Sequence, residues 1–394
     1  MKMIITILLI LLILFAFLFL WTWIGYPVFL FFASKLFKKK HLISDNYMPK
    51  VTLMIMSYNE AKVIEKKIKN SLELDYPKDK LEIFVVDSAS NDGTQDIVKK
   101  YSKEVRLIEQ SERKGKASAI NYGMKYASGE IIMITDSNAM MNKQAIKKIA
   151  RHFSNKRVGG VCGRFEARDI RDTSIGAGGN IYWKIERFLR QNESMIDSAI
   201  HMSGEITAFR KGVINKVDES SLSEDFDMAI RIRKAGYRII YEPEAIAYEP
   251  APENVKDLLT QKKRITIGTW QELIKHKKVM FNPRYGWYGL VILPSHKLFQ
   301  VLTPFFLILM FLCSAIIYAF TNDSLILIFL MVQGIFYFLA IVSFIPLRAI
   351  EKFPLFVFIK YFMATNWILL LGFFDFIRKK RIVTWKKIES SRNI

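Results

Sequence analysis

The chain has 394 residues, of which 51% are hydrophobic, and it carries a formal net charge of +21. This apolar fraction excludes an ordinary water-soluble protein, and the length leaves room for a catalytic domain together with membrane segments. Lysine and arginine are spread along the chain without a recognisable nucleic-acid motif, so we expect no nucleic-acid partner. Anionic lipid and a phosphorylated substrate account for the positive charge more economically.

The N-terminus predicts a membrane anchor. Residues 4–32 contain no charged side chain, and Lys35, Lys38, Lys39 and Lys40 follow at once. The run exceeds the ~20 residues that cross a bilayer, and the lysines favour a cytoplasmic continuation. A cleaved signal peptide is the alternative, but its apolar part usually spans only about 7 to 15 residues. We therefore expect residues 1–40 to be a retained anchor.

The region from 41 to 283 predicts an α/β domain. Short apolar runs occupy residues 51–56, 82–87, 105–110 and 130–136, with helix-compatible stretches between them. This spacing is typical of βαβ units and a parallel, doubly wound sheet. Such sheets bind ligands beyond the carboxyl ends of their strands, so the residues that follow each run are candidates for a site.

Acids and amides follow three of the four runs, in "SYNE", "DSASNDGT" and "DSN". Asp87 and Asp136 end apolar strands that should converge on one crevice, which favours a function for both. Asn91, Gly93 and Thr94 are interpreted equally well as turn and helix-cap residues.

Seven segments in order resemble the motifs of a family 2 glycosyltransferase of the membrane-embedded synthase type, similar to poly-N-acetylglucosamine, hyaluronan and cellulose synthases. They are "MSYNE", "VVDSASNDGT", "RKGKASAIN", "IIMITDSN", "SGEITAFRKG", "SEDFDMAIRIRKAGYRIIYEPEA" and "QKKRI". The resemblance implies a Rossmann-like GT-A domain that binds a nucleotide sugar on the cytoplasmic side, followed by an α-helical transmembrane region.

The resemblance also implies a metal site. The family's D-x-D motif corresponds here to Asp136, Ser137 and Asn138, so an amide replaces the second acid. Asp136 and Asn138 are the expected ligands of Mg²⁺ or Mn²⁺, which accept oxygen donors and would stabilise the charge that develops on the leaving diphosphate.

Donor-binding residues follow from the same motifs. Asp87 is expected to contact the nucleoside base, with Glu60 at the edge of the same pocket. Lys114 and Lys116 are expected near the base or the phosphates, with solvated loop charges as the alternative. A UDP-sugar is the expected donor.

The acids at 224–227 predict the acceptor side of the site. Asp225 matches the family's base, which takes a proton from the acceptor hydroxyl in an inverting transfer, and Glu224 is expected to orient or complete this site. Two adjacent carboxylates raise each other's pKa, which suits a base near neutral pH. The alternative is a helix cap in which acids complement the helix dipole, and we assign Asp227 to that role.

The segment "QKKRI" resembles the synthase motif Q-x-x-R-W. Gln261 and Arg264 are expected to bind the donor, with Arg264 as a diphosphate clamp. Ile265 occupies the position where the family has a tryptophan that supports the acceptor sugar. The resemblance therefore supports sugar transfer more strongly than processive synthesis. Trp270 is nearby but need not substitute for that tryptophan. Residues 252–276 predict an interfacial helix, or else an ordinary amphipathic helix packed on the sheet.

Residues 284–377 predict interfacial and transmembrane helices. Uncharged runs at 298–322 and 324–347 each suit a span, whereas 353–374 contains Lys360 and is a weaker one. A third crossing would place the basic tail, 378–394, outside, against the positive-inside rule. We therefore expect the last block to be re-entrant or interfacial.

These observations predict a multi-pass protein of the cell membrane with a cytoplasmic catalytic domain. The expected activity is that of a metal-dependent inverting hexosyl- or N-acetylhexosaminyl-type transferase that acts on a glycan acceptor in polysaccharide synthesis. Two alternatives stay open: non-processive transfer to a polyprenyl-linked lipid, and a catalytically silent nucleotide-sugar-binding scaffold, which the replacements Asn138 and Ile265 would suit.

Overall fold

The computed structural model describes residues 1–168, 174–250, 255–345, 347 and 353–378. Its longer helices are α1 (Lys2–Leu20), α2 (Tyr26–Leu36), α3 (Ile64–Leu72), α4 (Thr94–Lys99), α5 (Lys116–Met124), α6 (Ala145–Ala150), α7 (Ser174–Ile196), α8 (Glu224–Lys234), α9 (Val255–Lys275), α10 (Phe299–Thr321), α11 (Ser324–Ser343) and α13 (Pro354–Ile377). Its strands are β1 (Val51–Ser57), β2 (Leu81–Asp87), β3 (Arg106–Glu109), β4 (Ile131–Asp136), β5 (Met140–Met141), β6 (Val158–Arg168), β7 (Thr207–Arg210) and β8 (Arg238–Pro250).

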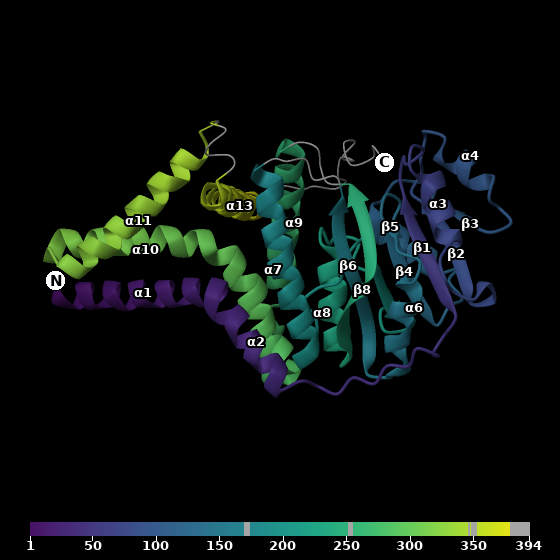
Figure 1. Ribbon diagram of the computed structural model, residues 1–394, viewed down its shortest axis with the longest axis horizontal. Coiled ribbons are helices and arrows are strands. Elements are labelled where there is room, and N and C mark those ends of the chain that lie inside the picture. The colour runs from purple at the N-terminus through teal and green to yellow at the C-terminus, as the bar shows by residue number, and fades with distance from the viewer. Residues whose placement is uncertain (169–173, 251–254, 346, 348–352, 379–394) are drawn as a thin grey trace.

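The molecule separates a sheet from a helical bundle (Figure 1). The sheet lies at the right of the view, and helices α1, α10 and α11 extend away from it to the left. Helices α7 and α9 stand between these two parts. A layer of helices thus separates the sheet from the apolar bundle.

The sheet confirms the four predicted strands. Its order is β3-β2-β1-β4-β7-β6-β8-β5, and the first four strands are parallel neighbours. Strand β1 is buried along its whole length, because α3, α4 and α6 pack on one face of the sheet while α5 and α8 pack on the other. Strands covered on both faces are continuous apolar runs, which is why the sequence revealed them.

The second half of the sheet differs from the expected parallel pattern. Strand β7 is antiparallel to both β4 and β6, and the short strand β5 is antiparallel to β8. Strand β6 pairs with β8 in parallel, with register shifts at two points. Strand β6 starts with Val158, Gly159 and Gly160, so it lacks the continuous apolar run on which the prediction of the other strands relied.

Within the described residues, four helical segments are long and apolar enough to cross a membrane. The first joins α1 to α2 through the π-helical turn Trp21–Gly25. The second runs from Tyr288 to Thr321, through the π-helical turns η6 (Tyr288–Ile292) and η7 (Pro294–Leu298), and ends with α10; the others are α11 and α13. The two later uncharged runs predicted as spans, at 298–322 and 324–347, thus fall on helices.

The last apolar block is one uninterrupted helix, α13, that is long and apolar enough to cross a membrane, and its re-entrant or interfacial placement stays a prediction. Figure 1 shows α13 almost end-on, whereas α1 and α10 lie in the plane of the view. Helix α13 packs along α9: the rings of Trp270 and Phe373 are 5.0 Å apart, and Lys263 Nζ lies 2.5 Å from Asp375 Oδ2. This crossing arrangement suits an interfacial helix, which stays a prediction. The basic tail beyond Arg378 and residues 252–254 of the predicted interfacial helix lie outside the described residues.

The contact between α13 and α9 depends on a glycine. A Cβ atom on Gly372 would lie 2.6 Å from Thr266 Cγ2, whereas a Cβ on Gly334 in α11 would meet nothing within 4 Å. We expect Gly372→Ala to lower the midpoint of thermal unfolding in detergent, at a cost of about 1–3 kcal/mol for the overpacked contact. Gly334→Ala is the matched control and should be neutral or stabilising by up to ~1 kcal/mol. Equal midpoints for the two variants would contradict the packing.

Candidate active site

The parallel strands bring two predicted acids to one edge of the sheet. Ser57 at the end of β1 pairs with Asp87, and its neighbour Met56 pairs with Asp136. Because β1 lies between β2 and β4, the two acids flank the same strand end. The convergence expected from the sequence is therefore present, although the roles of the two acids stay predictions.

Asp87 is fully buried and organises the loop that follows it. Its carboxylate accepts hydrogen bonds from the Ser90 backbone N–H at 2.8 Å, the Ser90 hydroxyl at 2.5 Å and Gln95 Nε2 at 2.8 Å. The neighbouring Glu60 is also buried, and its backbone N–H donates to Thr94 Oγ1 at 2.8 Å. The loops after β1 and β2 thus form one bonded unit, and Thr94 has the turn role proposed as its alternative.

A lysine joins the predicted donor side of the site to the predicted acceptor side. Lys116 Nζ lies 2.5 Å from Asp136 Oδ1 and 3.7 Å from Glu224 Oε1, and it donates to the Gly204 carbonyl at 3.1 Å. Burial opposes the charged form, but Asp136 and Glu224 together raise the pKa of Lys116. The ammonium is therefore held at the point where β4 meets the first turn of α8.

Two acids near this ammonium, Asp225 and Glu205, have raised pKa values. Burial and the charge of Glu224 raise the pKa of Asp225 to about 6, while Lys116 and Arg264 oppose the shift. Burial and the charge of Asp136 raise the pKa of Glu205 to about 7. Glu205 lies within the predicted motif "SGEITAFRKG", but nothing in the spacing of that motif distinguished it as a site residue.

Helix α9 brings a second cation toward Asp225. Arg264 Nη1 donates to the Leu222 carbonyl at 3.4 Å, two residues before Glu224, and its charge reaches Asp225. Gln261 lies three residues earlier on the same helix and is half-buried. Ile265 is 44% exposed, and Trp270 is buried against α13. Trp270 therefore does not take the position of the missing aromatic.

Lys114 and Lys67 have surroundings that differ from those of Lys116. Lys114 is not brought to Asp136; its side chain is 58% exposed and pairs with Glu112 at 3.2 Å. Lys67, which the sequence did not single out, is fully buried beneath the strand end. Its Nζ donates to Thr135 Oγ1 at 2.9 Å and to the Ala139 carbonyl. A lysine in an amphipathic helix is usually exposed, so no sequence signal revealed it.

Asp227 lies in the first turn of α8, as the predicted helix-dipole role requires, but its side chain also has partners outside that turn. Helix α8 has no side-chain capping bond at Ser223, and the Asp227 side chain is completely buried. Its carboxylate lies 2.6 Å from Arg231 Nε, 2.7 Å from Lys275 Nζ and 2.8 Å from His276 Nε2. Asp227 therefore ties α8, which carries Asp225, to α9, which carries Arg264.

This cluster also has the spacing of a metal site. Ligand atoms of Asp227, Glu272 and His276 lie within 4.8 Å of one another. Lys275 Nζ, however, lies 2.7 Å from Asp227 and 3.2 Å from Glu272, so a cation already neutralises these acids. We interpret the cluster as an ion-pair network between two helices.

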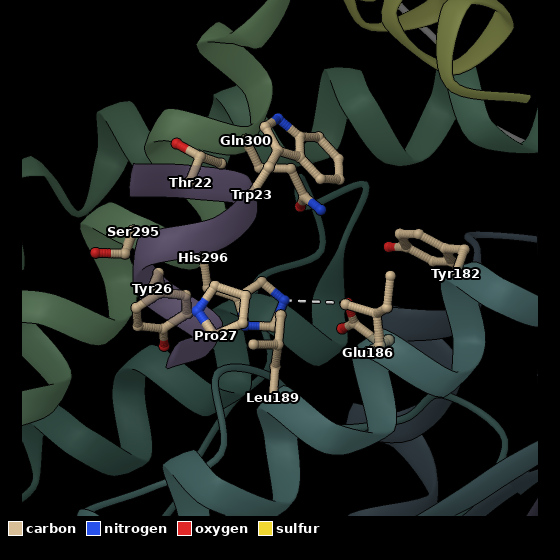
Figure 2. A pocket seen from close by; sticks show the side chains of 11 residues that line it. Thr22, Trp23, Tyr26, Pro27, Tyr182, Glu186, Leu189, Ser295, His296 and Gln300 are labelled. Carbon is tan, nitrogen blue, oxygen red and sulfur yellow. Dashed lines mark hydrogen bonds and ion pairs between the residues drawn. The ribbon is translucent and has the colours of Figure 1, made fainter. Parts of the chain in front are cut away.

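A small pocket lies outside this site, where the first and second candidate membrane spans meet α7 (Figure 2). Its volume of about 40 Å³ suits a few water molecules and not a sugar ring. On one side of it His296 lies between two buried acids, 2.5 Å from Glu193 Oε1 and 3.0 Å from Glu186 Oε2. The hydroxyl of Tyr26 in α2 donates to the same Glu193 oxygen at 2.7 Å. These contacts connect α2 and η7, which belong to the first and second candidate membrane spans, to α7.

The buried position of Asp227 generates a prediction for stability. Asp227→Asn would remove the charge that Lys275, Arg231 and His276 share, which we expect to cost about 3–5 kcal/mol of unfolding free energy. Asp218→Asn is the matched control, because Asp218 also pairs with Lys275 at 2.6 Å but its side chain is 26% exposed. Thermal unfolding of both variants at pH 7 checks this. A midpoint for Asp227→Asn at or above that of Asp218→Asn would be inconsistent with the network described.

Comparison with known proteins agrees with this geometry. A family model described as glycosyl transferase family 2 matches residues 52–218. A probable glycosyltransferase, YdaM of Bacillus subtilis, is 30% identical over 246 residues, which are 60% of this chain and 59% of that protein. A poly-beta-1,6-N-acetyl-D-glucosamine synthase of Staphylococcus epidermidis is 25% identical over 261 residues, 64% of this chain and 63% of that protein. The chain thus spans about three fifths of the curated relatives it matches.

A solved structure shares the fold over almost the whole chain. The mannosyltransferase PcManGT from Pyrobaculum calidifontis, in complex with GDP-Man and Mn²⁺, aligns with a TM-score of 0.72 and 24% identity, covering 94% of this chain and 100% of that one. The expected GT-A fold is therefore confirmed, and residues 52–218 match the glycosyl transferase family 2 model.

Proposed function

We propose that the protein transfers a sugar, with inversion, from a nucleoside-diphosphate sugar to a glycan acceptor at the membrane, in polysaccharide synthesis. The observation that carries the proposal is the contact of Lys116 with both Asp136 and Glu224, which joins the predicted donor and acceptor sides in one site. The donor to test first is a UDP-sugar that carries a hexose or an N-acetylhexosamine. The resemblance to a poly-N-acetylglucosamine synthase supports this choice.

The charges of the site suit a divalent cation. Asp136, Glu205, Glu224 and Asp225 influence one another or Lys116 electrostatically, so four acids surround one ammonium. Asp136 and Asn138 would hold Mg²⁺ or Mn²⁺ through oxygen atoms, as these hard ions prefer. The ion would neutralise the charge that develops on the diphosphate. The fold is shared with a mannosyltransferase solved with Mn²⁺, which supports this assignment.

The protein's own residues would divide the remaining work. Asp225 would accept the proton of the acceptor hydroxyl, and its pKa of about 6 leaves it ionised at neutral pH while keeping it a useful base. Glu224 would orient the acceptor and sustain the raised pKa of its neighbour. Lys116 and Arg264 would bind the diphosphate, and Asp87 and Glu60 would line the base pocket.

The four candidate membrane spans support a location of this chemistry at a bilayer. Helix α9 lies between the sheet and the helices α1, α10 and α11, and it shares with α13 the ion pair of Lys263 with Asp375. We propose a multi-pass protein of the cell membrane, with the catalytic domain and its donor in the cytoplasm. The lysines after α2 support this orientation under the positive-inside rule.

A second acceptor fits one particular observation. Ile265 is exposed where the synthase motif has an aromatic, and Trp270 is buried in another direction. Transfer of one sugar to a polyprenyl-linked lipid would not need an aromatic platform for a growing chain. Ile265 and Asn138, which replace an aromatic and an acid of the family motifs, would suit a catalytically silent scaffold. Nucleotide binding alone, however, would not require Asp225, Arg264 and Lys116 together.

Release of nucleoside diphosphate tests the proposal. Purified protein in lipid with Mg²⁺ or Mn²⁺ should release diphosphate from one member of a panel of sugar nucleotides. Asp225→Asn should slow this release by about 10²- to 10⁴-fold, because an amide cannot accept the proton. Asp79→Asn, an exposed acid before β2, is the matched control and should behave as the native chain. Equal rates for the native chain and Asp225→Asn would exclude Asp225 as the base.

The acid limb of the pH profile gives a separate test. Turnover at saturating donor should rise as pH increases through about 6, because only the ionised carboxylate of Asp225 is a base and its pKa is raised to about 6. The charge of Glu224 is one cause of the raised pKa of Asp225. Glu224→Gln removes that charge, so the acid limb of this variant should move to lower pH whatever its absolute turnover rate. A limb that stays in place or moves to higher pH would contradict the assignment of the two acids.

A further inference from the structure

A glutamate outside the predicted motifs contacts the strand-end segment Asp136-Ser137-Asn138. Asn138 is 1% exposed, and its Nδ2 donates to Glu249 Oε1 at 2.5 Å. Glu249 lies near the end of β8, more than a hundred residues along the chain, and no sequence motif connected it with the metal site. An amide that replaces an acid in this segment therefore has a carboxylate directly beside it.

Backbone pairing fixes Glu249 in this place. In the ladder between β5 and β8, Met140 pairs with Tyr248 and Met141 pairs with Ala247. The antiparallel register brings Glu249 opposite the residue before Met140, at the end of the loop that contains Asn138. On its other side Glu249 pairs with Ala167 of β6. Since β8 is held on both sides, the carboxylate is positioned by the sheet and not by a mobile loop.

The neighbouring side chains determine which atoms remain for an ion. Ser137 is 2% exposed and its hydroxyl donates to the Met56 carbonyl at 2.7 Å, so this side chain is directed into the sheet. Because the amide nitrogen of Asn138 is used by Glu249, its Oδ1 is the atom left to coordinate a cation. Asp136 adds a carboxylate that is 26% exposed, and its Oδ1 lies 2.5 Å from Lys116 Nζ, so the ammonium would have to share or leave this carboxylate when an ion binds.

We propose that Glu249 supplies the second carboxylate of the divalent-cation site, in place of the acid that Asn138 replaces. The inference rests on the proposed transferase function. The site would then comprise the carboxylates of Asp136 and Glu249 and the amide oxygen of Asn138, a set of oxygen donors with two negative charges. Such a set suits Mg²⁺ or Mn²⁺ bound together with a nucleoside diphosphate.

Manganese binding tests this inference without turnover. The full-length protein in detergent is titrated with Mn²⁺ at saturating UDP, and then GDP, and the free ion is measured by electron paramagnetic resonance. Glu249→Gln keeps the size of the side chain and removes its charge, and we expect it to weaken Mn²⁺ binding about 10- to 100-fold. The exchanged variant, Asn138→Asp combined with Glu249→Gln, places the carboxylate at position 138 instead of 249. It should recover Mn²⁺ binding toward the native value.

A control on the same strand separates a local effect from general weakening. Glu244→Gln also removes a charge from β8, but the Glu244 side chain is 57% exposed and pairs with Lys148, so Mn²⁺ binding should not change. Unchanged binding in Glu249→Gln would overturn the inference, as would a native protein that binds no Mn²⁺ with either nucleotide. If Glu249→Gln does not fold, the exchanged variant decides, because weak binding by a folded exchanged variant would also reject the charge role. Diphosphate release by the native chain is measured independently, so failure of the transferase proposal is recognised separately.

Discussion

The ion pairs of Lys116 are the interaction on which the candidate site depends. This ammonium lies between Asp136, which ends a strand of the parallel half-sheet, and Glu224, which begins a helix packed on the antiparallel half. Without an opposite charge between them, acids at these two positions would repel one another, and each would favour its protonated form. One buried lysine thus makes it possible for the two halves of the domain to present acids to the same crevice.

The sequence predicted those parts of the fold and site that depend on local pattern. Strands covered on both faces are continuous apolar runs, so β1, β2 and β4 were recognised, together with the acids that end β2 and β4. Asp136, Lys116 and Glu224 were all candidates, and the structure places them in contact. Their chemical roles stay predictions, because proximity shows what a group can do and not what it does.

The parts that the sequence did not reveal depend on tertiary contacts. Lys67 occurs in a helix whose other lysines are solvated, and only packing buries it. Glu249 is adjacent to Asn138 because β5 and β8 pair across a hundred residues. Asp227 resembles a first-turn helix acid, but Lys275 of α9 and the following His276 join Arg231 of its own helix as its partners. In each case the deciding neighbour is distant in the chain, so local propensity and periodicity carry no information about it.

Helix α9 has different neighbours along its length. Arg264 is directed toward the start of α8. The preceding residue, Lys263, pairs with Asp375 of α13, and Trp270 packs on Phe373 of the same helix. The guanidinium expected to hold the leaving diphosphate is therefore mounted on a helix that rests against the apolar part of the molecule. If α13 lies at a bilayer, as proposed, a lipid thickness or lateral pressure that displaces it would change the reach of Arg264, and the proposed transfer would then depend on the composition of that bilayer.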